Sequence, residues 1–129
     1  MNLAMALEMS AECFPDRIAV SSDGKNMTYG ELLSAAKRAA AEIKASGVKY
    51  VGLLDISSLA VPVAVFASAF AGVPYVPLNY RLTKPELEEL LERISPAYLV
   101  TDTPAISPLT VPAGVQVVLR EDFLKLARS

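Results

Sequence analysis

The sequence lacks histidine and tryptophan, and Cys13 is its single cysteine. The absence of histidine removes the commonest general base and the commonest metal ligand of proteins. A single cysteine excludes an internal disulfide and suits a reducing compartment, so we expect a cytoplasmic protein. Since no base can be identified for Cys13, we interpret it as a packed or idle thiol rather than a nucleophile.

Charge is low and evenly spread. The 12 basic and 14 acidic residues give a net charge of −2, without any run of basic residues, so the chain offers no electrostatic footprint for nucleic acid. The N-terminus lacks the basic start of a secretory signal and carries Glu8 and Glu12. We expect a surface helix there instead, with Asn2 as its N-cap. Its weak apolar face is predicted from the helical spacing of Leu3, Ala6, Leu7 and Ser10.

The six glycines stand apart from one another. A Walker loop needs two glycines around four residues followed by Lys and Ser or Thr, and a dinucleotide-binding fold needs three clustered glycines, so both motifs are excluded. No Gly-x-Ser-x-Gly elbow is present for a serine nucleophile. The pair Asp23-Gly24 is typical of a hairpin turn rather than a phosphate loop.

A long uncharged stretch dominates what is present, because no charged residue lies between Asp55 and Arg81. A membrane-spanning helix would need about 20 unbroken apolar residues. Gly72 instead suits a helix C-cap, and two prolines beyond it prevent the helix from continuing. The stretch therefore predicts a core helix over residues 58–71 and a short strand over residues 75–78, and no transmembrane segment.

Capping boxes mark the starts of two further helices. Thr28 and Glu31 open a helix that runs to about residue 46, and Thr83 and Glu86 open a second that runs to residue 94. Both carry apolar residues at helical spacing. These are Leu32, Ala36, Ala40 and Ile43 in the first helix and Leu87, Leu90, Leu91 and Ile94 in the second. A short helix is predicted over residues 121–127.

The remaining apolar runs predict strands. A hairpin consists of residues 18–22 and a return strand that begins at Met27. Further strands are predicted over residues 51–54, 98–101 and 115–119, with a proline-rich loop over residues 102–112. Because helices connect strands from residue 28 onward, the predicted fold class is α/β, an open, mostly parallel sheet with flanking helices. Residues 1–129 are expected to form one domain.

Ligands of open α/β sheets gather beyond the carboxyl ends of the strands, which here are residues 55–58, 79–81 and 101–103. Arg81 is the cation of this set that could bind an anion. We favour structural roles for the polar residues: caps from Ser57 or Ser58 and from Thr83, a turn fixed by Asn79, a surface ion pair for Arg81. The acidic residues of the 83–94 helix are interpreted as a solvated face. No catalytic or metal-binding residue is assigned, and cofactor-binding residues are left unassigned.

Four groups of residues, in order along residues 14–102, share a further pattern. Residues 14–20 and 27–32 read FPDRIAV and MTYGEL, residues 71–79 read AGVPYVPLN, Leu82-Thr83 is followed by Glu86-Leu87, and residues 98–102 read YLVTD. Together they resemble the adenylate-forming superfamily, whose members include AMP-binding acyl-CoA synthetases, luciferases and peptide-synthetase adenylation domains. One departure is a shortened loop at residues 47–50, where the family usually has a Gly-Asp-Arg turn.

The resemblance implies an enzyme that uses ATP and Mg²⁺ to activate a fatty acid or other carboxylate as an acyl-adenylate, and then passes the acyl group to coenzyme A. It implies a role in fatty-acid metabolism. The family's phosphate loop, adenine and ribose contacts and catalytic lysine lie downstream of Asp102 and have no counterpart before Ser129. We therefore expect the N-terminal subdomain of a longer ligase, inactive by itself, binding none of these cofactors, with the remainder of the polypeptide as its partner.

Two alternatives stay open. The hydrophobic content of 53% exceeds the usual share and suggests that apolar surface is covered by another domain or by a second protein chain. A non-catalytic α/β interaction module, able to form a homodimer, would also explain this content. The other alternative is an ATP-binding module complete in itself.

Overall fold

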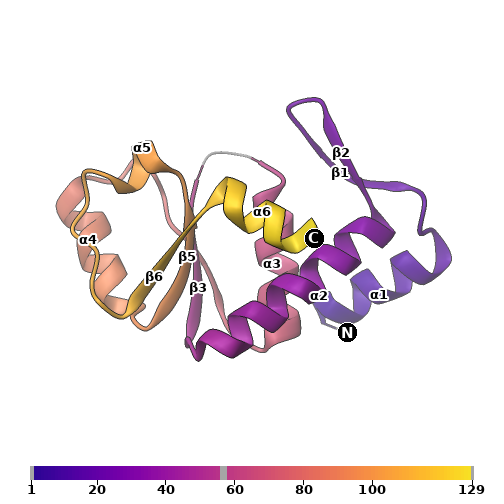
Figure 1. Cartoon of the computed structure of the whole chain (residues 1–129), viewed down its shortest axis with the longest axis horizontal. Coiled ribbons are helices and arrows are strands. Elements are labelled where there is room, and N and C mark those ends of the chain that lie inside the picture. The colour runs from indigo at the N-terminus through magenta and orange to yellow at the C-terminus, as the bar shows by residue number, and fades with distance from the viewer. Residues whose placement is uncertain (1, 56–57, 129) are drawn as a thin grey trace.

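The computed structural model describes residues 2–55 and 58–128. Its centre is a four-stranded parallel sheet in the order β4–β3–β5–β6 (Figure 1). The strands are β3 (Tyr50–Leu54), β4 (Tyr75–Pro77), β5 (Ala97–Thr101) and β6 (Val115–Leu119). The central strands β3 and β5 pair from Tyr50 opposite Ala97 to Leu54 opposite Thr101. The predicted fold class, an open parallel sheet with flanking helices, is confirmed.

Helices cover both faces of this sheet (Figure 1). One face carries α2 (Tyr29–Ser46), α3 (Ala60–Ala71) and α6 (Arg120–Arg128), and α1 (Leu3–Cys13) packs against α2 and α3. The other face carries α4 (Lys84–Arg93) and the short α5 (Thr103–Ile106). Alternate side chains of a strand point to opposite faces. Leu53 and Val100 therefore belong to the first core, and Leu54 and Leu99 to the second.

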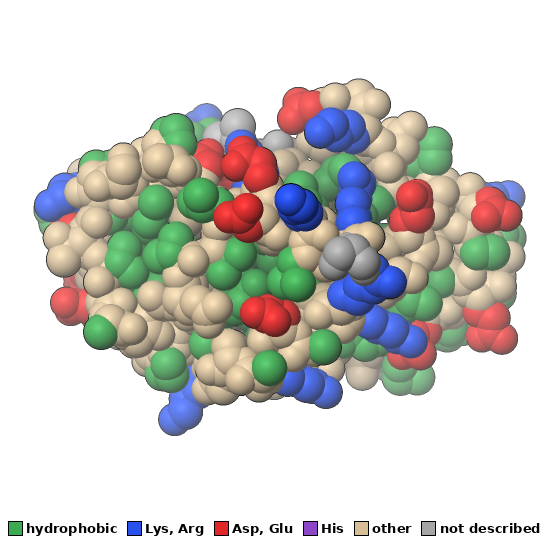
Figure 2. All heavy atoms as spheres, viewed as in Figure 1, with side chains coloured by type: hydrophobic (Ala, Val, Ile, Leu, Met, Phe, Trp, Pro, Cys, Tyr) green, Lys and Arg blue, Asp and Glu red, His purple; other side chains and the backbone are tan. Residues whose placement is uncertain are grey.

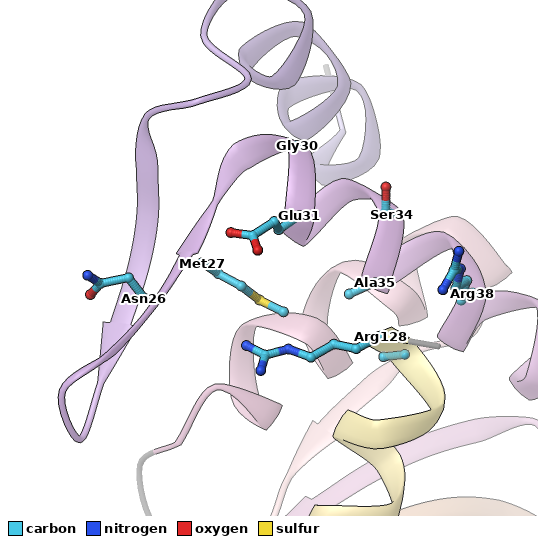
Figure 3. A pocket seen from close by; sticks show the side chains of 9 residues that line it. Asn26, Met27, Gly30, Glu31, Ser34, Ala35, Arg38 and Arg128 are labelled. Atoms are coloured by element: carbon cyan, nitrogen blue, oxygen red, sulfur yellow. The ribbon is translucent and has the colours of Figure 1, made fainter.

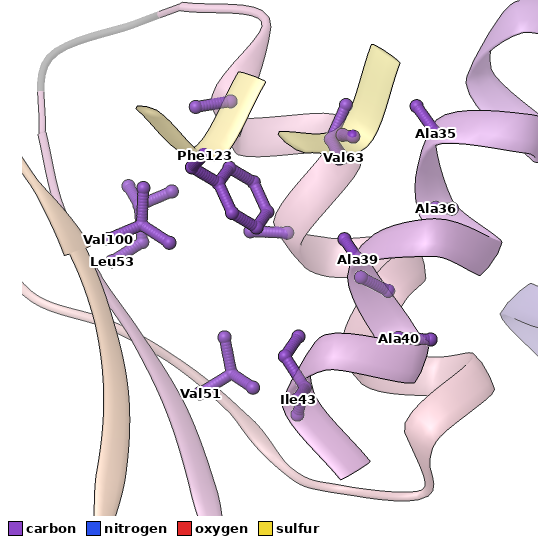
Figure 4. Close-up of a cluster of buried hydrophobic side chains, with 14 of the residues drawn as sticks. Ala35, Ala36, Ala39, Ala40, Ile43, Val51, Leu53, Val63, Val100 and Phe123 are labelled. Carbon is purple, nitrogen blue, oxygen red and sulfur yellow. The ribbon is translucent and has the colours of Figure 1, made fainter. Parts of the chain in front are cut away.

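The larger core is built on close contact between small residues of the helices. Ala36 and Ala39 of α2 and Ala64 and Ala67 of α3 are fully buried, and their small side chains let the two helices approach closely. Phe123 of α6 fills the space between these helices and the sheet (Figure 4). Its ring meets Tyr98 of β5 edge-on, with the two ring centroids 6.2 Å apart.

Local sequence signals set the element ends. Thr28 and Thr83 each form the predicted capping box, and Gly72 ends α3 in the left-handed conformation with φ of 72°. The antiparallel hairpin of β1 (Ile18–Ser22) and β2 (Lys25–Thr28) turns at Asp23 and Gly24, which both have positive φ. These predictions are confirmed.

Three expectations were wrong in detail. The return strand of the hairpin begins at Lys25 rather than Met27. Leu3 is 52% exposed at the start of α1, whereas Leu7 and Ala11, one and two turns further along the same side of the helix, are buried against the body. The stretch predicted as a loop contains α5, which Asp102 caps. Within residues 2–55 and 58–128, no helix is long and apolar enough to cross a membrane.

Candidate functional site

A pocket of about 270 Å³ opens at the carboxyl edge of the sheet. The chain leaves β3 toward β4 on one side and leaves β5 toward β6 on the other. The carboxyl ends of β3 and β5 therefore form the switch point at which open α/β sheets bind ligands. The lining is mostly apolar with two carboxylates, and consists of Leu54, Asp55, Tyr80, Leu87, Asp102, Pro104 and Ala105.

Arg120 closes this edge by joining the two carboxylates. Its Nη1 atom lies 2.7 Å from Oδ1 of Asp55 and 3.7 Å from Oδ2 of Asp102. The Asp55 side chain is 0% exposed and that of Arg120 is 24% exposed. The Ser58 hydroxyl donates a further hydrogen bond to Oδ2 of Asp55, at 3.2 Å. A buried carboxylate needs such partners, because removing one leaves an uncompensated charge away from water.

The polar residues after β5 are used by the fold itself. The buried Thr101 hydroxyl donates to the carbonyl of Leu54, at 2.6 Å, and so ties β5 to β3. Asp102 accepts from the backbone N–H of Ala105 at 2.8 Å and caps α5. The same carboxylate group thus caps a helix and lies beside Arg120.

Arg81 is placed differently from our expectation. Its guanidinium lies 5.7 Å from the ring centroid of Tyr80, and among the described residues it forms no ion pair with a carboxylate, so the predicted surface ion pair is wrong. Asn79 fixes the turn as predicted, because its Oδ1 accepts from the Arg81 N–H at 2.9 Å. Anion binding by Arg81 stays a prediction.

The caps mostly follow the sequence. The Ser58 hydroxyl accepts from the N–H of Ala60, Thr83 caps α4, and Ser57 lies outside the described residues.

The acidic face of α4 is only partly a solvated one. Glu88 accepts from the N–H of Thr110 at 2.6 Å and lies 3.3 Å from Nζ of Lys84, so it also holds the loop before β6 against α4.

Sequence reasoning missed Arg120. It stands directly after β6, at the carboxyl end of a strand, so the rule that selected the other three strand ends would have selected it too. Its partner Asp55 is 65 residues away in the chain, and no local pattern joins them.

A second pocket of about 480 Å³ lies between β2, α2 and α6 (Figure 3). Glu31, Arg38 and Arg128 are its charged lining. Glu31 is engaged in the α2 capping box, and the hydrogen bond from the Thr28 backbone lowers the pKa of its carboxyl group. The charge of Glu31 therefore stabilises the start of a helix.

The edge pocket does not fit the phosphates of ATP or coenzyme A. Its charged lining is two carboxylates, and the nearby Arg120 is already neutralised by both. Polyphosphates are held by free cations or by backbone N–H groups. Over residues 2–55 and 58–128, no group of three or more His, Cys, Asp or Glu is placed to hold a metal. We therefore derive no step of nucleotide chemistry from these residues.

The comparison with family models matches residues 7–128 to the AMP-binding enzyme family. The chain belongs to the AMP-binding enzyme family. The match includes every described helix and strand that forms the sheet and its edge pocket. The resemblance inferred from the ordered motifs is confirmed.

The relatives of this chain include two classes of enzyme. It is 30% identical over 105 residues to the indoleacetate–CoA ligase of Aromatoleum aromaticum, covering 79% of this chain and 21% of the ligase. It is 29% identical over 118 residues to a dimodular nonribosomal peptide synthase of Bacillus subtilis, covering 89% of this chain and 5% of that protein. This chain thus spans about a fifth of the length of the CoA ligase.

The fold has close structural counterparts. The AMPPNP-bound form of the nonribosomal peptide synthetase FmoA3 superposes with a TM-score of 0.81 at 28% sequence identity, covering 94% of this chain and 14% of that one. The likeness covers nearly all of this chain.

Proposed function

We propose that the chain is the N-terminal subdomain, residues 1–129, of an AMP-forming acid–thiol ligase. The observation that carries this proposal is the family match over residues 7–128. The ligase converts a fatty acid or another carboxylic acid to an acyl-adenylate with ATP and Mg²⁺, and transfers the acyl group to coenzyme A. The AMPPNP-bound relative supports the use of ATP.

Within that enzyme the subdomain has a structural role. Both carboxylates that line its edge pocket, Asp55 and Asp102, are already paired with Arg120. The rest of the polypeptide would supply the groups that bind ATP, Mg²⁺ and coenzyme A. We assign no catalytic residue to residues 1–129, and we propose a cytoplasmic location because these residues contain a single cysteine.

Coenzyme A is the acceptor that we propose, and its support is the indoleacetate–CoA ligase relative. The nonribosomal peptide synthase relative makes a peptide-synthetase adenylation domain the competing assignment. Both classes form an adenylate first. They differ in the thiol that receives the acyl group.

The test is an assay of the protein encoded by the complete reading frame. ATP–pyrophosphate exchange is measured with a panel of fatty, aromatic and amino acids, and each acid that supports exchange is then tested for thioester formation with coenzyme A. We expect exchange with at least one carboxylic acid and a CoA thioester of the same acid. Exchange with amino acids alone, and no CoA thioester, would transfer the assignment to the peptide-synthetase class. No exchange with any acid would overturn the ligase.

A non-catalytic interaction module is the second candidate, and the apolar outer face of α3 favours it. Sedimentation of the same protein, combined with the exchange assay, separates the two. A stable dimer without exchange activity supports the module, whereas exchange activity supports the ligase.

A further inference from the structure

α3 differs from the other helices in having no polar outer face. It carries no charged residue between Ala60 and Ala71, and its one polar residue, Ser68, is buried and donates to the carbonyl of Ala64. The half-buried residues from Val61 to Phe70 are all apolar: Val61, Pro62, Val65, Phe66, Ala69 and Phe70. Val61, Phe66 and Phe70 also pack against the larger core, whereas Pro62, Val65 and Ala69 do not belong to it. A helix that is hydrophobic all round belongs in the interior of a protein.

The neighbouring helices of the same layer show the ordinary pattern. α2 exposes Lys37, Arg38 and Lys44, and α6 exposes Glu121 and Asp122. Figure 2 shows Lys and Arg side chains gathered over the part of the surface where α2 and α6 lie. The apolar outer face therefore belongs to α3 and not to the whole helical layer.

The outer face of α3 borders two apolar grooves. A groove of about 390 Å³ lies between β1 and α3 and includes Val20, Val65 and Phe66 in its lining. A second groove of about 300 Å³ lies between α1, β1 and α2, and Phe66 lines it as well. Because Phe66 and Val20 belong to both grooves, the apolar surface is continuous from α1 to α3. We call this surface the α3 face.

The end of the described chain lies in the same helical layer. Arg128, at the end of α6, lines a pocket together with Met27 at the base of the hairpin and Ala35 of α2 (Figure 3). A polypeptide that continues beyond α6 would start near the hairpin and on the same side of the sheet as α3. The CoA ligase relative is about five times as long as its matched region, since that region is 21% of its length.

We infer that the α3 face is the surface on which the part of the ligase beyond residue 129 docks. This inference rests on the proposed function and names the interface through which the subdomain joins the rest of the enzyme. The docked partner is apolar where it meets Val61, Val65 and Phe66, with Lys37 at the rim, where its Nζ lies 5.9 Å from the ring centroid of Phe70. Charged residues are depleted at the cores of such interfaces, and polar groups gather at their rims.

The experiment measures thiol labelling in the protein encoded by the complete reading frame, with Cys13→Ser as the background. Any other cysteine in that protein is replaced by Ser as well. Three single-cysteine variants are compared under native conditions: Val65→Cys on the α3 face, Lys44→Cys on the exposed side of α2, and Ala67→Cys on the buried side of α3. Each rate of maleimide reaction is divided by the rate for the same variant in denaturant.

We expect Val65→Cys to react as slowly as Ala67→Cys and about tenfold or more slower than Lys44→Cys, because a covered thiol reacts only after local opening. Reaction of Val65→Cys at the rate of Lys44→Cys would overturn the inference. Protection that disappears on dilution, together with a dimer in sedimentation, would make a second copy the occupant and would also overturn it.

The exchange assay on the three variants keeps the two proposals apart. Adenylate formation with a freely labelled Val65→Cys would leave the ligase assignment standing and remove the docking surface. Concentration-independent protection without adenylate formation would support the docking surface and remove the ligase assignment.

Discussion

α2 and α3 lie side by side on the same face of the sheet, yet they are stabilised in different ways. α2 exposes charged residues along its outer side and begins at a complete capping box formed by Thr28 and Glu31. The outer residues of α3 are apolar and half-buried, and its N-cap, Leu59, makes no side-chain capping bond. The Ser58 hydroxyl supplies one bond to that end, through the Ala60 N–H.

The C-terminal ends of the two helices are alike. Gly47 and Gly72 both adopt the left-handed conformation, with φ of 71° and 72°, which glycine adopts without steric cost. The difference therefore lies at the start and along the outer side. α2 is stabilised by local bonds as well as by packing, whereas α3 depends on burial, and most helical stability in proteins comes from such burial.

The largest expected effect on stability comes from weakening the packing of a helix on the sheet, a feature that α2 and α3 share. Ile43 of α2 is 0% exposed and lies beside Val51 of β3 (Figure 4). We expect Ile43→Ala to lower the free energy of unfolding by about 2–5 kcal/mol, because it removes buried methyl groups and leaves a cavity. Urea unfolding followed by circular dichroism measures it. The control is Lys44→Ala, an exposed neighbour, and equal losses in the two variants would contradict the buried position of Ile43.

A smaller loss of stability is expected from removing the N-terminal side-chain cap, which α2 has and α3 lacks. Thr28→Ala removes the hydroxyl that accepts from the N–H of Glu31 at 3.1 Å, and such a change costs about 1 kcal/mol of stability. Thr28→Ser keeps the acceptor and should restore most of the loss. Leu59→Ala changes no capping bond at α3, so any loss there reports packing. Urea midpoints of the three variants measure the difference, and a Thr28→Ala midpoint equal to that of the parent would refute the cap.

The smallest effect is a dependence on pH. The Thr28 backbone N–H lies 2.9 Å from the Glu31 carboxylate and lowers its pKa below the ordinary 4.5. A group whose pKa is lower in the folded state stabilises the fold above its unfolded pKa, and this contribution is lost as the pH falls through the folded value. We expect the urea midpoint of Glu31→Gln to fall less steeply than that of the parent as the pH drops below about 4.5.

Two other helices serve as comparisons for Glu31→Gln. α3 carries no acidic residue, so it contributes nothing to the dependence of the urea midpoint on pH. Glu86 of α4 has its pKa lowered by the equivalent bond from Thr83, so Glu86→Gln should flatten the slope in the same direction. A Glu31→Gln midpoint that falls as steeply as that of the parent would show that the capping bond carries no pH-dependent stability.

The elements with local signals could be predicted from the sequence. Thr28, Thr83 and Gly72 mark helix ends by their own chemistry, and the apolar spacing of Leu87 and Leu91 fixes the buried side of α4. Four ordered motifs were sufficient to indicate the family, because they are spread in order along residues 14–102. The fold class followed from helices that alternate with strands.

The features that depend on distant partners could not be predicted. α5 is a four-residue helix inside a proline-rich segment, and only the Asp102 cap, in place of apolar spacing, marks it. Leu3 shares its side of α1 with the buried Leu7, but it is the first residue of the helix and stays exposed. The ion pair of Arg120 with Asp55 joins the ends of β6 and β3 across β5, and sequence spacing contains no information about such a pair.

That ion pair also selects the alignment of the edge strand. β6 reads VQVVL and pairs with β5 so that Leu119 lies opposite Thr101. A pairing shifted by two residues would keep each side chain on the same face of the sheet. The sequence of β6 alone distinguishes poorly between these two pairings. A two-residue shift would carry Arg120 about 6.6 Å along the sheet. The buried Asp55 would then lose this cation, and an uncompensated buried charge is costly. A single arginine after the last strand thereby gives a nearly featureless strand one alignment with its neighbour.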